Sequence, residues 1–93
     1  MLDLGIKAFL LETYVPGLDQ AAASRIAASL SAATAKLRTR GSTIELLHSF
    51  AVLGEETCFS LFSAATHADV RTAAQLAKIG YEQLAEVICY RGG

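Results

Sequence analysis

The stretch that most constrains the fold is Ile44–Ala65, where two strongly apolar runs are separated by a short polar break. The first run is Ile44–Leu53, and the second is Thr57–Ala64, which is rich in Phe, Leu and Cys. The break at Gly54–Glu56 is typical of the turn in a β-hairpin. Apolar residues occupy both alternating sets of positions, so both faces of the hairpin need cover from the rest of the chain.

A strand and a long helix are predicted before the hairpin. Ile6–Val15 has the β-branched and aromatic content of a strand, and Pro16–Gly17 stops it. Asp19 is a good N-cap for a helix that ends near Gly41. Within that helix the apolar residues are spaced by three or four positions, so they form one stripe, at Ile26, Leu30, Ala33 and Leu37.

A second helix and a last strand are predicted after the hairpin. Thr66 opens the helix, with Asp69 three residues later as its capping-box partner, and Gly80 ends it. Leu84–Tyr90 follows as a strand, and Arg91–Gly93 is expected to fray.

The resulting order β-α-β-β-α-β predicts an α+β, ferredoxin-like fold in a single domain covering residues 1–93. Two helices can cover only one face of a four-stranded antiparallel sheet. Because 53% of the residues are hydrophobic, the second face is also apolar. We therefore expect a homodimer in which the sheet of a second subunit covers that face.

The alternation of residues predicts which side chains lie on the face that the helices leave uncovered. Phe9 and Leu11 are expected to face the helices. Because side chains alternate along a strand, Glu12 and Tyr14 are then expected on the uncovered face. In the second strand, one set is expected to share a face: Ile44, Leu46, His48, Phe50 and Val52. The uncovered face would then carry Leu10, Tyr14, Phe50 and Phe62, or their alternates.

Charge and composition argue against several classes of protein. Eight basic and nine acidic residues are scattered along the chain without a basic stripe, so nucleic acid is not an expected partner. Charges such as Lys7 and Glu12 interrupt the apolar runs, so no membrane span is expected. Met1–Gly5 lacks the basic region of a secretory signal, and two isolated cysteines form no disulfide framework. These features predict a cytoplasmic protein.

Glu12 and His48 are the candidate catalytic residues, because a carboxylate next to an imidazole can move protons in a cavity that excludes water. The competing interpretation is that the two side chains only satisfy each other at the dimer interface. A ligand pocket is predicted to include Tyr14, Phe50, Ser60, Phe62 and Tyr81. Cys58 is expected to be a small buried hydrophobe, and His67 a solvated or capping residue.

Two segments and one glycine resemble a known family: Leu10–Gly17 (LLETYVPG), Glu55–Ala64 (EETCFSLFSA) and Gly80. Together they resemble small ferredoxin-like proteins often described as nickel-binding, many of them without a known function. The resemblance implies the βαββαβ fold and a homodimer closed through its sheets into an α+β barrel. It also implies nickel ligands that are histidines near the sheet and the second helix.

The sequence departs from that ligand set. Only His48 stands where the resemblance implies a metal-binding histidine, and Glu12 stands where a member of the family can have another. Leu76 and Tyr81, near the end of the second helix, are not nitrogen donors. No cofactor is therefore expected, although the resemblance leaves nickel binding as an alternative.

Four functions remain compatible with the sequence. The first is a homodimer that binds a small apolar molecule in a cavity between sheet and helices or at the dimer seam. The second is a cofactor-free enzyme of the isomerase, cyclase or monooxygenase kind, with Glu12 and His48 as its acid–base pair. The third is a protein that binds nickel or another divalent metal, and the fourth is a purely structural dimerisation module.

Overall fold

The computed structural model describes residues 5–90, which form one sheet and two long helices. Residues 1–4 and 91–93 lie outside the described residues. The expectations about a secretory signal at the N-terminus and about fraying of Arg91–Gly93 concern these residues. The elements are β1 (Ile6–Tyr14), α1 (Gln20–Thr39), β2 (Glu45–Val52), the short 3₁₀ helix η1 (Leu53–Glu55), β3 (Thr57–Ser63), α2 (His67–Ala77) and β4 (Gln83–Cys89).

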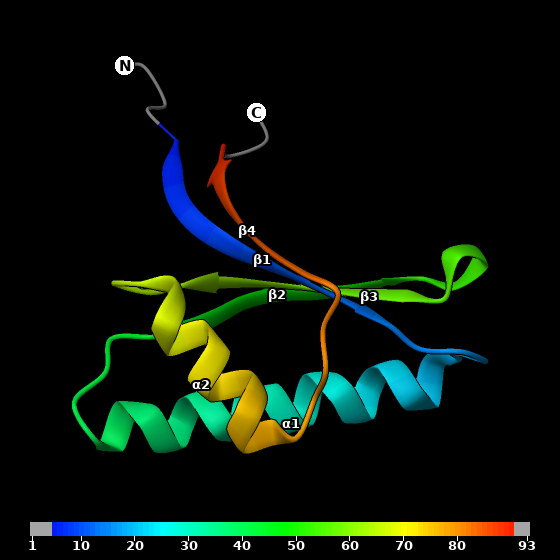
Figure 1. Cartoon of the computed structure of the whole chain (residues 1–93), viewed down its shortest axis with the longest axis horizontal. Helices are drawn as coiled ribbons and strands as arrows, with labels where there is room; N and C mark the ends of the chain where they lie inside the picture. The colour runs from blue at the N-terminus through cyan, green and yellow to red at the C-terminus, as the bar shows by residue number, and fades with distance from the viewer. Residues whose placement is uncertain (1–4, 91–93) are drawn as a thin grey trace.

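The four strands form an antiparallel sheet in the order β2-β3-β1-β4, with both helices on the same side (Figure 1). This arrangement confirms the ferredoxin-like α+β fold. Strands β1 and β3 are central, while β2 and β4 form the edges. Neither α1 nor α2 has the length and apolar composition that a membrane-crossing helix needs.

Helix α1 begins and ends where its sequence predicts. The Asp19 side chain accepts a hydrogen bond from the backbone N–H of Ala22 at 2.8 Å, as an N-cap does. At the other end, Gly41 has a φ of +97°, a conformation that glycine adopts without steric cost and that is typical of the residue after a C-cap. The expected apolar stripe faces the sheet: Leu30, Ala33 and Leu37 are buried and Ile26 is half-buried.

Helix α2 differs from its prediction at both ends. Thr66 is the N-cap residue, but its side chain makes no capping bond, and the Asp69 carboxylate instead accepts a hydrogen bond from the Ser42 hydroxyl at 3.2 Å. The helix also stops at Ala77, because Lys78 takes a left-handed conformation with φ +58°. Gly80 therefore lies in the loop beyond the helix rather than at its end.

The hydrophobic core lies between the sheet and the helices. Phe9 and Leu11 from β1 and Phe62 from β3 are at most 2% exposed, and they pack with Leu30 of α1 and Val70 of α2. This confirms that Phe9 and Leu11 face the helices. In Figure 1, α2 lies across part of α1 only, and the N-terminal part of α1 extends beyond it under the β2–β3 end of the sheet.

An irregularity in β2 changes the expected alternation. Leu46 is opposite Phe62, whereas His48 is opposite Leu61, so the register shifts between Leu46 and His48. A bulge of this kind inserts one extra residue and moves later side chains to the other face. Leu46 therefore faces the helices, but His48 and Phe50 face away from them, and the single shared face expected for these residues is wrong.

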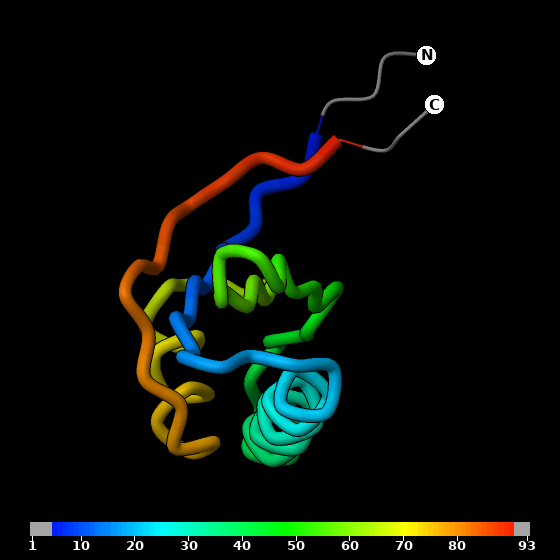
Figure 2. Tube along the Cα trace, turned by 90° about the vertical axis from the view of Figure 1, so that its right-hand side faces the viewer, coloured from blue at the N-terminus to red at the C-terminus, as the bar shows by residue number. Residues whose placement is uncertain are grey.

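The outer ends of β1 and β4 form a two-stranded arm that rises away from the helices (Figure 2). Ile6, Ile88 and Tyr90 on this arm are each at least 60% exposed. Gly5, with φ +71°, lies so close to Ile88 and Tyr90 that a Cβ atom there would come within 2.7 Å of both side chains. Glycine at position 5 thus allows the arm to close on itself.

Candidate functional site

The face of the sheet opposite the helices, here called the open face, carries a continuous set of apolar side chains with two polar ones among them. Because paired residues of antiparallel strands point to the same side, the register assigns its central members directly. They are Leu10, Glu12, His48, Phe50, Phe59 and Leu61.

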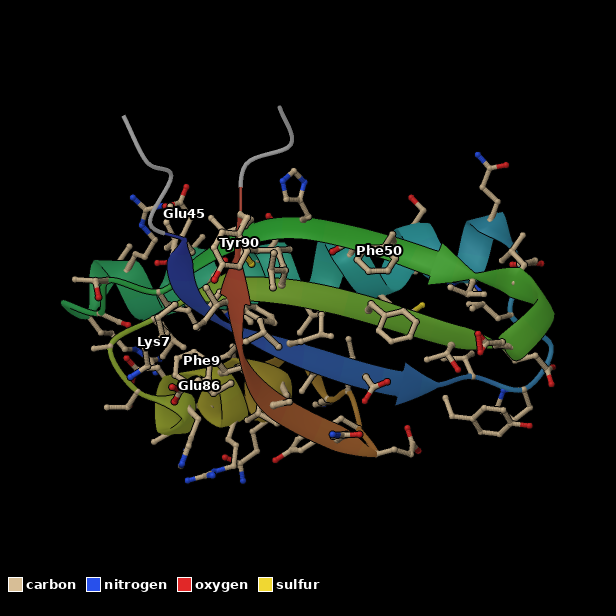
Figure 3. All side chains as sticks on the ribbon, turned by 90° about the horizontal axis from the view of Figure 1, so that it is seen from above. Lys7, Phe9, Glu45, Phe50, Glu86 and Tyr90 are labelled. Atoms are coloured by element: carbon tan, nitrogen blue, oxygen red, sulfur yellow. The ribbon has the colours of Figure 1, made fainter. Side chains whose placement is uncertain are left out.

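Two of these residues form an aromatic pair. The rings of Phe50 and Phe59 stack with their centroids 5.1 Å apart. Figure 3 looks onto the open face, with the labelled Phe50 on β2 turned toward the viewer. Phe50 is 53% exposed in the single chain, and Val52 beside it is 37% exposed. Exposed aromatic pairs of this kind are common where a protein or ligand docks.

Glu12 and His48 share the open face, as predicted, but they are not neighbours. Glu12 is opposite Phe59, which is opposite Phe50, and His48 lies two residues before Phe50 on the edge strand. Two strand spacings and two residue steps separate their Cα atoms by roughly 12 Å. A hydrogen bond between the two side chains cannot form within one chain, so any Glu12–His48 pair would need a second subunit.

The described residues do not fit the ligand set of a metal ion. Within residues 5–90, no group of three or more His, Cys, Asp or Glu side chains is placed to hold one. His48 is alone at its edge of the open face, and Leu76 and Tyr81 supply no nitrogen ligand. The nickel chemistry that the family resemblance implies therefore has no support from the arrangement of these residues.

A cleft of about 250 Å³ lies on the other side of the sheet, between α1 and the strands β2 and β3. We call it the α1 cleft. Its roof is the N-terminal half of α1, through Ala23, Ser24 and Ala27. Its floor is made by two cross-strand pairs, Ser49 with Ser60 and Ala51 with Cys58.

The cleft exists because small side chains face each other across the two layers. Where β2 and β3 present Leu46 and Phe62 to the helices, the space is filled by the core. Further along the same strands, serine, alanine and cysteine replace these large residues, and the facing turns of α1 also carry alanine and serine. Small residues on both sides leave a gap that the folded chain does not fill.

Ser60 lies on the floor of this cleft, and 3% of its surface is exposed. Next to it, Cys58 is 5% exposed, and burial raises the pKa of its thiol above the ordinary value. The cleft thus offers the hydroxyls of Ser49 and Ser60 and a neutral thiol, and none of its lining residues is charged.

The five residues predicted as a ligand pocket are not brought together. Phe50 and Ser60 both line the α1 cleft, but Phe62 is fully buried in the core. Tyr14 is 51% exposed at the end of β1, and Tyr81 is 37% exposed in the loop before β4. Ser60 is opposite Leu11 and faces the helices, so it lies on the other side of the sheet from Glu12 and His48.

His67 is exposed, as predicted for a solvated residue. It is the first residue of α2, and its ring meets the ring of Phe9 edge-on with centroids 6.3 Å apart.

The α1 cleft was not predicted from the sequence. The signal for it is the run of small residues on the helix side of β2, Ser49 and Ala51, which becomes readable only once the bulge before His48 is known.

Comparison with known proteins gives no family. No family model matches the chain, and no curated protein matches its sequence. The resemblance to the nickel-binding family therefore stays a prediction, and function has to be argued from the geometry alone.

Proposed function

We propose that this chain acts as a homodimeric protein that binds a small, largely apolar molecule, with the open faces of two subunits packed against each other. The open face is the observation that carries the proposal. Phe50 of its stacked Phe50–Phe59 pair is 53% exposed in the single chain, and Leu10 and Leu61 continue the apolar surface next to the pair. Monomeric proteins rarely leave an apolar area of this extent in water.

The size of the open face supports a second copy as its cover. Four strands spaced by about 4.8 Å and seven residues long span roughly 19 Å by 24 Å, a footprint on the order of 450 Å². Side-chain relief increases the accessible area above this flat value, and specific interfaces bury about 800 Å² per partner. The exposed apolar side chains of the arm, Ile6 and Tyr90, extend the surface that a partner can cover.

Glu12 would place a carboxylate at the centre of the interface between the two open faces. It lies between Phe59 and Gln83 on the neighbouring strands, and its carboxylate has no hydrogen bond or ion pair within residues 5–90. A carboxylate buried in an apolar seam is costly unless it gains a partner. His48 of the partner subunit or a polar group of a bound molecule would supply one.

An enzyme on the same scaffold is the second candidate, because Glu12 and His48 share the open face. The separation within one chain means that proton transfer between them would require a composite site made by both subunits. Glu12→Gln and His48→Ala variants separate the two candidates. Loss of turnover with retained ligand affinity favours the enzyme, whereas loss of affinity alone favours the binding protein.

The experiment that tests this proposal combines the subunit mass with ligand stabilisation. Native mass spectrometry is expected to give twice the chain mass of 9.8 kDa. A panel of small aromatic alcohols, ketones and carboxylic acids is expected to contain a compound that raises the thermal midpoint, since a ligand present at 100 times its Kd stabilises by about 2.7 kcal/mol. A chain mass of 9.8 kDa with no stabilising compound would contradict the proposal.

A further inference from the structure

We propose that the α1 cleft is the ligand site, and that it takes a neutral, planar aromatic molecule of about ten non-hydrogen atoms that carries one hydrogen-bonding group. The inference rests on the proposed function in assuming a small apolar ligand. It does not require the dimer, because the floor pairs Ser49–Ser60 and Ala51–Cys58 face the helices, although Phe50 and Phe59 of the open face also line the cleft.

The volume of the cleft sets the size of the ligand. An apolar cavity of about 150 Å³ holds benzene, which has six carbon atoms. By proportion, the 250 Å³ of the α1 cleft accommodates about ten non-hydrogen atoms. This is the size of a two-ring aromatic compound and is well below that of a nucleotide or a lipid.

The walls of the cleft set the character of the ligand. Most of the lining residues are small side chains on a helix and on two paired strands, Ala23, Ala27, Ala51 and Cys58 among them, so the space is a slit between two layers. A flat molecule fills such a slit best. The sulfur of Cys58 adds a favourable contact with an aromatic ring. Because no charged residue lines the cleft, a charged ligand would lose its hydration without compensation.

Ser60 supplies the polar contact. Ser60 lines the cleft and is 3% exposed, and Ser49, which also lines it, is the paired residue on β2. A ligand hydroxyl or carbonyl placed on the cleft floor would form a hydrogen bond with the Ser60 hydroxyl. Cys58 acts as a packing group, since its neutral thiol is a poor nucleophile.

The test uses 2-naphthol, a planar compound with eleven non-hydrogen atoms and one hydroxyl, followed by ¹H–¹⁵N NMR titration of the full chain. We expect saturable binding of one molecule per chain, with shifts at the amides of Ala27, Ser49 and Cys58. Ala27→Leu fills the cleft and is expected to weaken binding at least about tenfold. Ala28→Leu adds the same volume at an exposed position of α1 and should leave binding unchanged.

Ser60→Ala tests the polar contact. It is expected to weaken the binding of 2-naphthol about three- to tenfold and to leave naphthalene, which lacks the hydroxyl, unaffected. In a Cys89→Ser background, 2-naphthol should also slow the reaction of Cys58 with 4,4′-dithiodipyridine, which remains informative if Ala27→Leu folds poorly.

Two results would overturn the inference. One is an absence of saturable binding of 2-naphthol up to millimolar concentration, and the other is binding that Ala27→Leu does not change and that maps to the open face. If the chain is a dimer but either result is found, only the α1 cleft fails. If 2-naphthol binds in the cleft of a monomeric chain, the dimer in the proposed function fails instead.

Discussion

The rings of Phe50 on β2 and Phe59 on β3 stack within 16° of parallel on the face of the sheet that neither helix covers. The two residues are directly opposite each other across the strand pair, so the stack belongs to the sheet itself. With 53% of Phe50 exposed in the single chain, this aromatic surface is the part of the molecule that a second chain would most favourably bury.

Phe50→Asp is expected to break the dimer, because it places a charge at the centre of the seam where no cation of the described chain lies opposite it on β3. Sedimentation velocity of the variant should find monomers, or the protein should become insoluble. Leu76→Asp is the matched control, since Leu76 is 39% exposed but lies on α2, on the helix side. A soluble Phe50→Asp dimer with unchanged affinity would place the interface elsewhere.

Two phenylalanines of β3, Phe59 and Phe62, lie on opposite faces of the sheet and are expected to differ in what they stabilise. Phe62 is fully buried against the helices, so Phe62→Ala should lower the free energy of unfolding by about 3–5 kcal/mol. Phe59, which is half-buried on the open face, should affect dimer dissociation more than unfolding of the subunit. Urea unfolding and a concentration series on both alanine variants measure these effects. Equal losses of subunit stability would contradict the assignment of the two faces.

The order of helices and strands along the chain and most element boundaries follow from local signals. Pro16–Gly17 ends β1 and Asp19 begins α1, because backbone geometry and capping depend on only a few neighbouring residues. The side of the sheet on which Phe9 and Leu11 lie was also predictable, since side chains alternate regularly along β1.

The features that could not be predicted depend on contacts distant in sequence. The bulge before His48 shifts the register of β2, so His48 and Phe50 do not share a face with Leu46. The capping box of α2 does not form, because Ser42, 27 residues away from Asp69 in sequence, takes its carboxylate. The α1 cleft arises from small residues on three separate elements, and their juxtaposition has no local signature.

Gly5→Ala is expected to destabilise the arm formed by β1 and β4. A Cβ atom at position 5 would come within 2.7 Å of Ile88 and Tyr90, and the φ of +71° is itself unfavourable for alanine by about 1 kcal/mol. Urea unfolding should detect a loss of at least this size. Gly54→Ala is the control, because nothing lies within 4 Å of its added Cβ. Equal stability of the two variants would show that the arm does not close as described.

Cys58 is expected to make stability depend on pH in the alkaline range. Burial raises the pKa of its thiol in the folded chain, so the unfolded chain ionises first as the pH increases. Below the unfolded pKa of about 8.5 both states are protonated and the effect vanishes; above it the free energy of unfolding falls. Urea unfolding from pH 7 to 10 under reducing conditions should show this decline, and Cys58→Ala should reduce it. If the free energy of unfolding depends on pH identically in the unmodified chain and in Cys58→Ala, this role of Cys58 is contradicted.

The most direct test of the account is the mass of the folded chain in solution, because the open face either has a partner or is exposed to water. Sedimentation equilibrium at micromolar concentration should give a homodimer, with the arm and the open face protected from hydrogen exchange. A well-folded monomer at that concentration, with the amides of β2 and β4 exchanging freely, would contradict it.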